Sequence, residues 1–311
     1  MENKVLGLHH ITAIAGNARR NYDFYTRILG LRFVKKTVNF DDPGTYHFYF
    51  GDEVGTPGTI LTFFPWEGIT NGRQGTGMTT DIGYAVPDGS LEFWSDRLRK
   101  HDVRITGSGE RMGEAFLSFD DPDGLPLTLI VPSVPDNRKA WESEEVKASF
   151  ATRGFHSVTL SLRSVTETAS VLTEIFDYTL VKQEGNRYRY ATTAVKSAGI
   201  VDLLEAPNAP RAINAGGTVH HIAFRVKNED VLMQYREKVI AHGLNITPKI
   251  DRNYFFSLYF REPGGVLFEL ATDNPGFAVD ETVKELGTHL KLPPQYENRR
   301  AEIEKVLPSL V

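Results

Sequence analysis

Two doubled histidines stand in strand-like segments near opposite ends of the chain. The first lies in GLHHITAIA (7–15) and the second in GTVHHIAFRV (217–226). A third segment of the same type, GFHSVTLSL (154–162), has Ser157 where the second histidine would stand. Imidazoles can bind a metal or transfer protons near neutral pH, so their neighbours on the same face decide the chemistry.

Strand alternation identifies those neighbours, because side chains two residues apart along a strand point to the same face. His10 and His221 alternate with apolar residues that must pack under a helix. Glu269 alternates with apolar residues in VLFELA (266–271), and Tyr259 holds the matching position in the preceding strand. An unpaired carboxylate in such a strand would cost several kcal/mol. The second histidine of each pair therefore shares a face with a carboxylate that needs a partner.

These segments belong to four repeats of one module, in which a strand leads to a helix, a further strand, a turn and a last strand. The modules span residues 7–65, 79–132, 154–207 and 218–272. The repeat predicts an α+β fold in which four βαβββ modules pair into two cup-shaped mixed sheets. Modules one and four should form one cup, and modules two and three the other.

The chain, at 311 residues, is long enough for two domains and a tail. We expect an N-terminal domain over 1–135, a C-terminal domain over 150–275 and a helical tail over 276–311.

Composition excludes several classes of protein. The net charge is −5 and the basic residues are scattered, which argues against nucleic-acid binding. The absence of cysteine excludes disulfides and thiolate metal sites. No apolar run approaches the roughly 18 residues of a membrane span, and the N-terminus lacks the apolar core of a signal peptide. We expect a cytoplasmic protein without a membrane or nucleic-acid partner, with homo-oligomers left open.

Aligning the modules compares two positions in each. The strand-one position holds, in chain order, His10, Asp81, Ser157 and His221. The last-strand position is predicted to hold Phe63, Thr128, Leu203 and Glu269. Two imidazoles and one carboxylate form the facial triad that leaves positions open on Fe(II). We expect a metal at His10, His221 and Glu269, and a second, degenerate cup at Asp81, Ser157 and Thr128.

The remaining candidate ligands are assigned structural or surface roles. They are His47, His156, Glu205 and His289. His156 is expected on the other strand face, and Glu205 lies past the aligned last-strand position.

The paired modules and their motifs resemble the vicinal oxygen chelate superfamily, which includes glyoxalase I, extradiol dioxygenases and the fosfomycin and bleomycin resistance proteins. The resemblance is closest to hydroquinone-type ring-cleaving dioxygenases, and it covers nearly the whole chain. The stretches that carry it are GLHHIT, RFVKKTVNFDDPGTYHFYFGDEVGTPGTILTFFP (32–65), GFHS, EGNRYRY (184–190), HHIAF and DRNYFFSLYFREPGGVLFE (251–269).

This resemblance implies an Fe(II)-dependent enzyme that inserts O2 into a hydroquinone- or catechol-type aromatic diol. It places Fe(II) on His10, His221 and Glu269, with Mn(II), or Zn or Ni in the purified protein, as alternative occupants. Catechol enzymes of this superfamily take their first histidine from module three, where Ser157 stands, so the hydroquinone-type arrangement is favoured.

The resemblance also implies residues that surround the metal and contact the substrate. They are His9, Thr12, His220, Arg252 and Tyr259. His9 or His220 would transfer protons, Tyr259 would hydrogen-bond the substrate oxygen, and Arg252 would offset negative charge.

Two alternatives stay open. One is a glyoxalase-like metal-dependent isomerase or lyase, whose usual fourth protein ligand would fall where Phe63 is aligned. The other is a non-catalytic resistance protein that binds an aromatic compound or an antibiotic. Oxygen uptake with hydroquinone separates all three.

Overall fold

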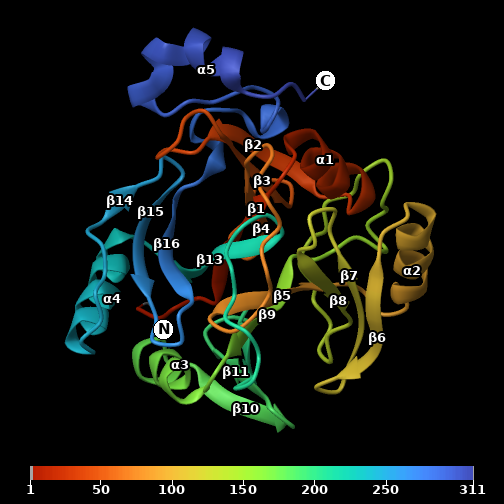
Figure 1. The fold of residues 1–311 in the computed structure, drawn as a ribbon, viewed down its shortest axis with the longest axis vertical. Helices are drawn as coiled ribbons and strands as arrows, with labels where there is room; N and C mark the ends of the chain where they lie inside the picture. Colours follow the sequence, from red (N-terminus) through yellow and green to blue (C-terminus); the bar gives the residue numbers. More distant parts are fainter. Residues whose placement is uncertain (1–2, 311) are drawn as a thin grey trace.

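Two mixed sheets of eight strands each make up the framework of residues 3–310, the part of the chain that this computed structural model describes (Figure 1). The predicted fold class is therefore confirmed. Strands from modules one and four form the first sheet, and strands from modules two and three form the second.

The first sheet has the order β14-β15-β16-β13-β1-β4-β3-β2. Its strands are β1 (Leu8–Ala15), β2 (Arg32–Val38), β3 (Tyr46–Gly51), β4 (Ile60–Pro65), β13 (Thr218–Val226), β14 (Ile250–Asp251), β15 (Phe255–Arg261) and β16 (Leu267–Pro275). The antiparallel pair β1–β13 joins the two modules at the centre of this sheet.

The second sheet has the matching order β10-β11-β12-β9-β5-β8-β7-β6. Its strands are β5 (Met78–Ala85), β6 (Ile105–Arg111), β7 (Glu114–Asp120), β8 (Pro126–Ile130), β9 (Phe155–Leu162), β10 (Thr179–Glu184), β11 (Arg187–Ala191) and β12 (Ile200–Glu205). Here the antiparallel pair β5–β9 joins the modules.

Each module contributes one helix, as the repeat predicts. The helices are α1 (Ala18–Asp23), α2 (Leu91–Lys100), α3 (Thr166–Ser170) and α4 (Glu229–Ala241). The side chain of Asn17 caps α1 and that of Asn228 caps α4, each accepting a hydrogen bond from a backbone N–H of the first turn. α1 and α3 each continue into a π-helical turn, over Phe24–Ile28 and Val171–Ile175. None of the helices in residues 3–310 is long and apolar enough to span a membrane.

The segment after β16 contains short 3-10 turns and α5 (Arg300–Val306), which lies at the edge of the molecule beyond β2 (Figure 1). Because each sheet combines strands from both halves of the chain, the division into an N-terminal domain, a C-terminal domain and a tail stays a prediction about folding units.

Strand register places the candidate ligands on one face. His10 on β1 pairs with Ala223 on β13, Ala223 pairs with Glu269 on β16, and Glu269 pairs with Tyr259 on β15. Paired residues on neighbouring strands point to the same side of a sheet, so this row of four shares a face. His221 lies two residues before Ala223 and points the same way. Ala223, with its small side chain, lies between His10 and Glu269 in this row.

The same register corrects the sequence alignment in modules one and three. In module four, Glu269 pairs with the residue two positions after the strand-one histidine. The residue paired at the same place is Thr62 in module one and Asp202 in module three. Phe63 and Leu203, which the sequence aligned with Glu269, are fully buried in the core instead, with Phe63 against Tyr25. The segments ILTFFP and IVDLLE are apolar at most positions, so alternation offered no anchor for the register.

Candidate metal centre

Three side chains from three neighbouring strands converge at one point of the first sheet. Oε2 of Glu269 lies 2.9 Å from Nε2 of His221 and 3.2 Å from Nε2 of His10. The two Nε2 atoms are 3.4 Å apart. Two ligands at right angles, each about 2.1 Å from a metal, lie about 3 Å from each other. The triangle therefore has the size of three adjacent metal ligands.

The first histidine of each pair fixes where the proton of the second lies. Nε2 of His9 is 3.1 Å from the carbonyl oxygen of Thr272, which only accepts, so this nitrogen carries a hydrogen. Nδ1 of neutral His9 then accepts from Nδ1 of His10, 3.0 Å away, and Nε2 of His10 is left with a free lone pair. His220 and His221 make the same Nδ1–Nδ1 contact at 2.8 Å. Each doubled histidine thus pairs a candidate metal ligand with the residue that orients it.

Burial keeps the two orienting imidazoles, His9 and His220, uncharged at neutral pH. Burial, with a smaller effect of His10, holds the pKa of His9 well below its ordinary value. Burial and the neighbouring His221 lower the pKa of His220 to about 3. Burial alone would raise the pKa of Glu269, but His10 and His221 outweigh it and hold this pKa well below its ordinary value, so the carboxylate is ionised.

A divalent metal fits this set of residues. Glu269 is fully buried, and neither of its carboxylate oxygens has a hydrogen-bond donor among the described residues. The nearest groups to its Oε2 are the Nε2 atoms of His10 and His221, so three potential ligand atoms lie within 3.4 Å of one another around a buried negative charge. A divalent cation bound by all three atoms would offset this charge, which is costly to bury unpaired. His10, His221 and Glu269 also form the one cluster of potential metal ligands found in residues 3–310.

A cavity of about 370 Å³ opens onto the cluster, with His10 and His221 in its wall. Its aromatic lining consists of Phe40, Tyr49, Phe64, Trp66, Phe255 and Tyr259. This volume is near the lower end of the range for small-molecule sites, and the lining suits one aromatic ring.

Tyr259 and Arg252 line this cavity beside the ligands. The Tyr259 ring lies 5.5 Å from the His221 ring and nearly perpendicular to it. Burial, together with Glu269, raises the pKa of Tyr259 above its ordinary value, so its hydroxyl keeps its proton. The Arg252 guanidinium sits 5.3 Å from the centre of the Tyr259 ring, and its Nη1 is 3.6 Å from Oδ2 of Asp41. A hydroxyl donor and a cation thus adjoin the triangle.

His47 also lines the cavity, although the sequence pattern predicted a structural or surface role for it. Its Nδ1 accepts from the Tyr49 hydroxyl at 2.9 Å, and its Nε2 donates to Thr62 Oγ1 at 2.8 Å. Thr62 in turn donates to Thr12 at 2.9 Å. A usable signal was present, because His47 and Tyr49 alternate in β3 with core phenylalanines and so must face the cup.

The remaining predicted residues lie around the ligands in different ways. His220 forms part of the cavity wall. His9 and Thr12 are buried and are not among the residues that line the cavity. The proposed proton transfer by His9 or His220 stays a prediction, and so does the role of Thr12.

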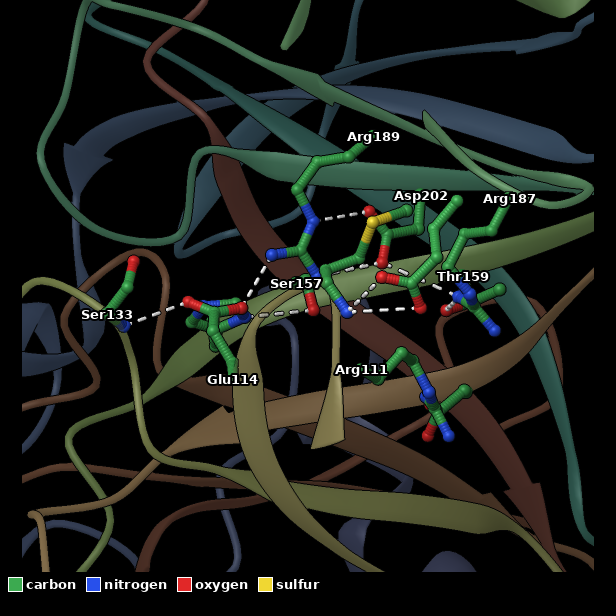
Figure 2. A network of polar contacts seen from close by, with 12 residues as sticks. Arg111, Glu114, Ser133, Ser157, Thr159, Arg187, Arg189 and Asp202 are labelled. Carbon is green, nitrogen blue, oxygen red and sulfur yellow. Dashed lines mark hydrogen bonds and ion pairs between the residues drawn. The ribbon is translucent and has the colours of Figure 1, made fainter. Parts of the chain in front are cut away.

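The second cup holds an ionic network at the positions that correspond to the metal ligands (Figure 2). Asp202, the counterpart of Glu269, accepts two hydrogen bonds from Arg189, at 2.8 and 3.0 Å. Arg189 also binds Glu114 at 2.5 Å, and Glu114 is 3.1 Å from His156. His156 contacts Ser157 at 3.1 Å, so this histidine lies inside the cup network.

This network balances its charge and fills its space. Its acidic groups are Asp81, Glu114 and Asp202, and its basic groups are Arg111, Arg187 and Arg189. The cavity left among them measures about 10 Å³, too little for a ligand. The degenerate cup is therefore closed by internal ion pairs.

A family model described as the Glyoxalase/Bleomycin resistance protein/Dioxygenase superfamily matches residues 7–129 and 154–270. A Bacillus subtilis protein named "Putative ring-cleaving dioxygenase MhqO" is 46% identical over 307 residues, covering 99% of this chain and 97% of that protein. A Sphingobium indicum protein named "Chlorohydroquinone/hydroquinone 1,2-dioxygenase" is 37% identical over 316 residues, covering 99% and 97%.

Solved structures agree with these relatives. The crystal structure of a protein described as a "putative dioxygenase" from Bacillus subtilis superposes with a TM-score of 0.95 at 45% identity, covering 99% of this chain and 98% of the other. Glyoxalase I from Zea mays superposes with a TM-score of 0.66 at 13% identity, covering 91% and 97%, which shows a shared fold alone.

Proposed function

The chain belongs to the Glyoxalase/Bleomycin resistance protein/Dioxygenase superfamily and to its ring-cleaving dioxygenases, and from this premise we propose that it uses Fe(II) and O2 to open the ring of a hydroquinone-type aromatic diol. One observation carries the proposal. A buried cluster of two imidazoles and one carboxylate lies at the wall of a cavity lined by aromatic side chains. The cytoplasmic location of the protein and its assembly into homo-oligomers stay predictions.

Fe(II) is the metal we assign to His10, His221 and Glu269. Two nitrogens and one carboxylate oxygen on one side of the metal are the ligand set of non-haem Fe(II) oxygenases. When bound, Fe(II) supplies the electronic path by which dioxygen reacts with an aromatic ring, a reaction that spin restriction blocks in solution. Mn(II), Zn and Ni remain alternative occupants of the same ligands.

The chain's own residues bind and orient the substrate. The aromatic rings of Phe64, Trp66 and Phe255 provide flat surfaces and exclude water. Tyr259, which keeps its proton, donates a hydrogen bond to the substrate oxygen next to the ligands, and Arg252 stabilises the negative charge that develops on it.

Tyr259→Phe is expected to keep its iron and to turn over about 10²–10³-fold more slowly, the usual cost of losing one preorganised donor. The measurement is the rate of oxygen uptake per iron, with iron content determined on the same sample. Tyr84→Phe is the matched control, because the Tyr84 hydroxyl is buried without a hydrogen-bond partner in the described structure. Equal rates for Tyr259→Phe and wild type at equal iron content would refute the role of the Tyr259 hydroxyl.

Substrate preference tests the proposal itself. With Fe(II) loaded anaerobically, the protein should consume oxygen stoichiometrically with hydroquinones, at a kcat/KM at least about 10-fold above that for catechols, which corresponds to about 1.4 kcal/mol. Three ligands leave room for one substrate oxygen and for O2, so a second adjacent hydroxyl is not required. The first histidine comes from module one, the arrangement that resembles the hydroquinone enzymes.

The possible results of this assay distinguish the predicted substrate preference from the ring-cleaving activity itself. Oxygen uptake with catechols and with no hydroquinone would overturn the preference and leave ring cleavage in place. No oxygen uptake with any diol at full iron content would overturn the proposed function. Turnover without oxygen would favour the glyoxalase-like alternative, in which a fourth protein ligand is usual; Thr62 holds that position here.

A further inference from the structure

A second and larger cavity, of about 670 Å³, has the candidate ligand His221 in its wall. His220, His221 and Leu267 line both this cavity and the aromatic cavity of 370 Å³. The rest of its wall comes from the segment before and at the start of β5, the residue after β9, the loop before β13 and the start of β13, and the end of β15 with the turn to β16. The candidate ligand His221 therefore lies in the wall of both cavities.

The charge of the second cavity is one-sided. Arg163, Arg211 and Arg261 line it, and its lining contains no aspartate or glutamate. All three arginines are exposed, and within residues 3–310 none of them forms an ion pair with a carboxylate. Arg261 donates to the backbone carbonyl of Gly265, whereas the guanidinium groups of Arg163 and Arg211 make no hydrogen bond in the described part of the chain. Three unpaired guanidinium groups around one cavity favour an anion.

This local charge contrasts with the rest of the protein and with the aromatic cavity. The whole chain carries a net charge of −5, so its overall field repels anions while the three arginines attract them locally. The aromatic cavity has a single arginine, Arg252, which already lies near Asp41. The two cavities therefore suit ligands of different charge.

Ring cleavage converts an uncharged ligand, which suits the aromatic cavity, into an anion, which suits the arginine cavity. A dihydroxybenzene is uncharged at neutral pH. Insertion of both atoms of O2 breaks one ring carbon–carbon bond and forms an aldehyde at one carbon and a carboxylic acid at the other. The carbon framework supplies all the electrons, no further reductant is needed, and the acid releases one proton to become a carboxylate. Substrate and product therefore differ by one negative charge.

We propose that the cavity lined by Arg163, Arg211 and Arg261 binds the carboxylate of the ring-opened product as it leaves the metal centre. This proposal rests on the proposed function for the identity of the anion. The aromatic cavity receives the neutral diol, and the arginine cavity draws the charged product. Guanidinium groups pair with carboxylates in a planar, two-bond geometry that suits this task.

The probe is 2,4-hexadienoate, a six-carbon conjugated monocarboxylate, with the uncharged alcohol 2,4-hexadienol as its neutral counterpart. Binding is measured by titration calorimetry on the Fe(II)-loaded protein without oxygen and on the metal-stripped protein. The test variant is Arg163→Gln/Arg211→Gln, because neither side chain makes a hydrogen bond within residues 3–310 that folding would lose. The control variant Arg99→Gln/Arg104→Gln removes two exposed arginines whose ion pairs lie outside the cavity.

Hexadienoate should bind wild type and the control variant equally, with or without iron, and more weakly as salt increases. The test variant should lose at least about 10-fold in affinity, or about 1.4 kcal/mol, and hexadienol should show no such difference. In oxygen-uptake assays hexadienoate should lower kcat without raising KM for hydroquinone, because it occupies a cavity other than the substrate's. That inhibition should be absent from the test variant.

Three results would overturn the proposal. They are equal affinity in the test variant and wild type, binding that disappears when the metal is removed, and competitive inhibition against hydroquinone. The calorimetry involves no turnover, so a failure of the ring-cleaving function would appear in oxygen uptake alone. A failure of the anion site would appear in the titrations while oxygen uptake with hydroquinone continued.

Discussion

Replacing Glu269 with glutamine is expected to leave the protein folded, without bound iron and without oxygen uptake. The amide keeps the size of the side chain but removes the one negative charge of the cluster. Two imidazoles then remain, and they bind a divalent metal far more weakly than the complete triad. Metal affinity should fall by more than the roughly 10–100-fold that is usual when a residue hydrogen-bonded to a metal ligand is removed. His10→Ala and His221→Ala should behave in the same way.

Iron per chain, measured by mass spectrometry after anaerobic loading, checks this expectation alongside thermal unfolding. Ser157→Ala is the matched control, because Ser157 holds the corresponding strand-one position in the other cup. It should keep full iron and activity. Full iron in Glu269→Gln, or an empty site in Ser157→Ala, would show that the metal lies elsewhere.

Strand alternation in the sequence was sufficient to place His10, His221, Glu269 and Tyr259 on one face. Each lies in a strand whose other face is mainly apolar, so a shift of one residue would have buried polar groups under a helix. The structure places these four on the adjacent strands β1, β13, β16 and β15, with His10, Glu269 and Tyr259 in one row and His221 two residues from it on the same face. Local periodicity carries enough information where one face is buried and the other is polar.

The alignment failed where that contrast is weak. In module one the sequence pattern favoured Phe63 instead of Thr62, and in module three it favoured Leu203 instead of Asp202. The second error hid the carboxylate that corresponds to Glu269. Where both faces of a strand are apolar, alternation does not show which residues face the cup. Only the pairing of β4 and β12 with their neighbouring strands determines this.

The sequence also could not predict which distant segments contact each other. The aromatic cavity combines residues from β3, β4, β13 and β15, and the arginine cavity combines Arg163, Arg211 and Arg261. No spacing rule connects positions that far apart, because loop paths decide which of them meet. The sequence suggested that the second cup is degenerate but could not show what fills it.

Arg189→Met is expected to lower the free energy of unfolding by about 3–5 kcal/mol, the usual result of removing one partner from a buried ion pair. Arg189 bridges Glu114 and Asp202, whose side chains are 5% and 3% exposed. Methionine preserves much of the volume but leaves both carboxylates without their main cation. Denaturant unfolding checks the value, and iron content should stay at the wild-type level because the network lies in the other cup (Figure 2).

The pH dependence gives this prediction a second readout. Burial would raise the pKa of Glu114, but His156 and Arg189 lower it from 4.5 to about 2. A carboxyl whose pKa is lower in the folded protein stabilises it above the ordinary value and loses that effect as the pH falls through the folded value. The difference between wild type and Arg189→Met should therefore be largest above about pH 4.5 and shrink toward pH 2.

Two further variants decide whether the network stabilises by charge pairing or merely fills the cup. Arg104→Met breaks an exposed pair with Asp120 and should cost less than about 1 kcal/mol. Adding Glu114→Gln and Asp202→Asn to Arg189→Met removes the unpaired charges and should recover part of the lost stability, because neutral groups of similar volume avoid the cost of buried ions. If the triple variant were less stable than Arg189→Met alone, packing around Arg189 and not its charge would close the second cup.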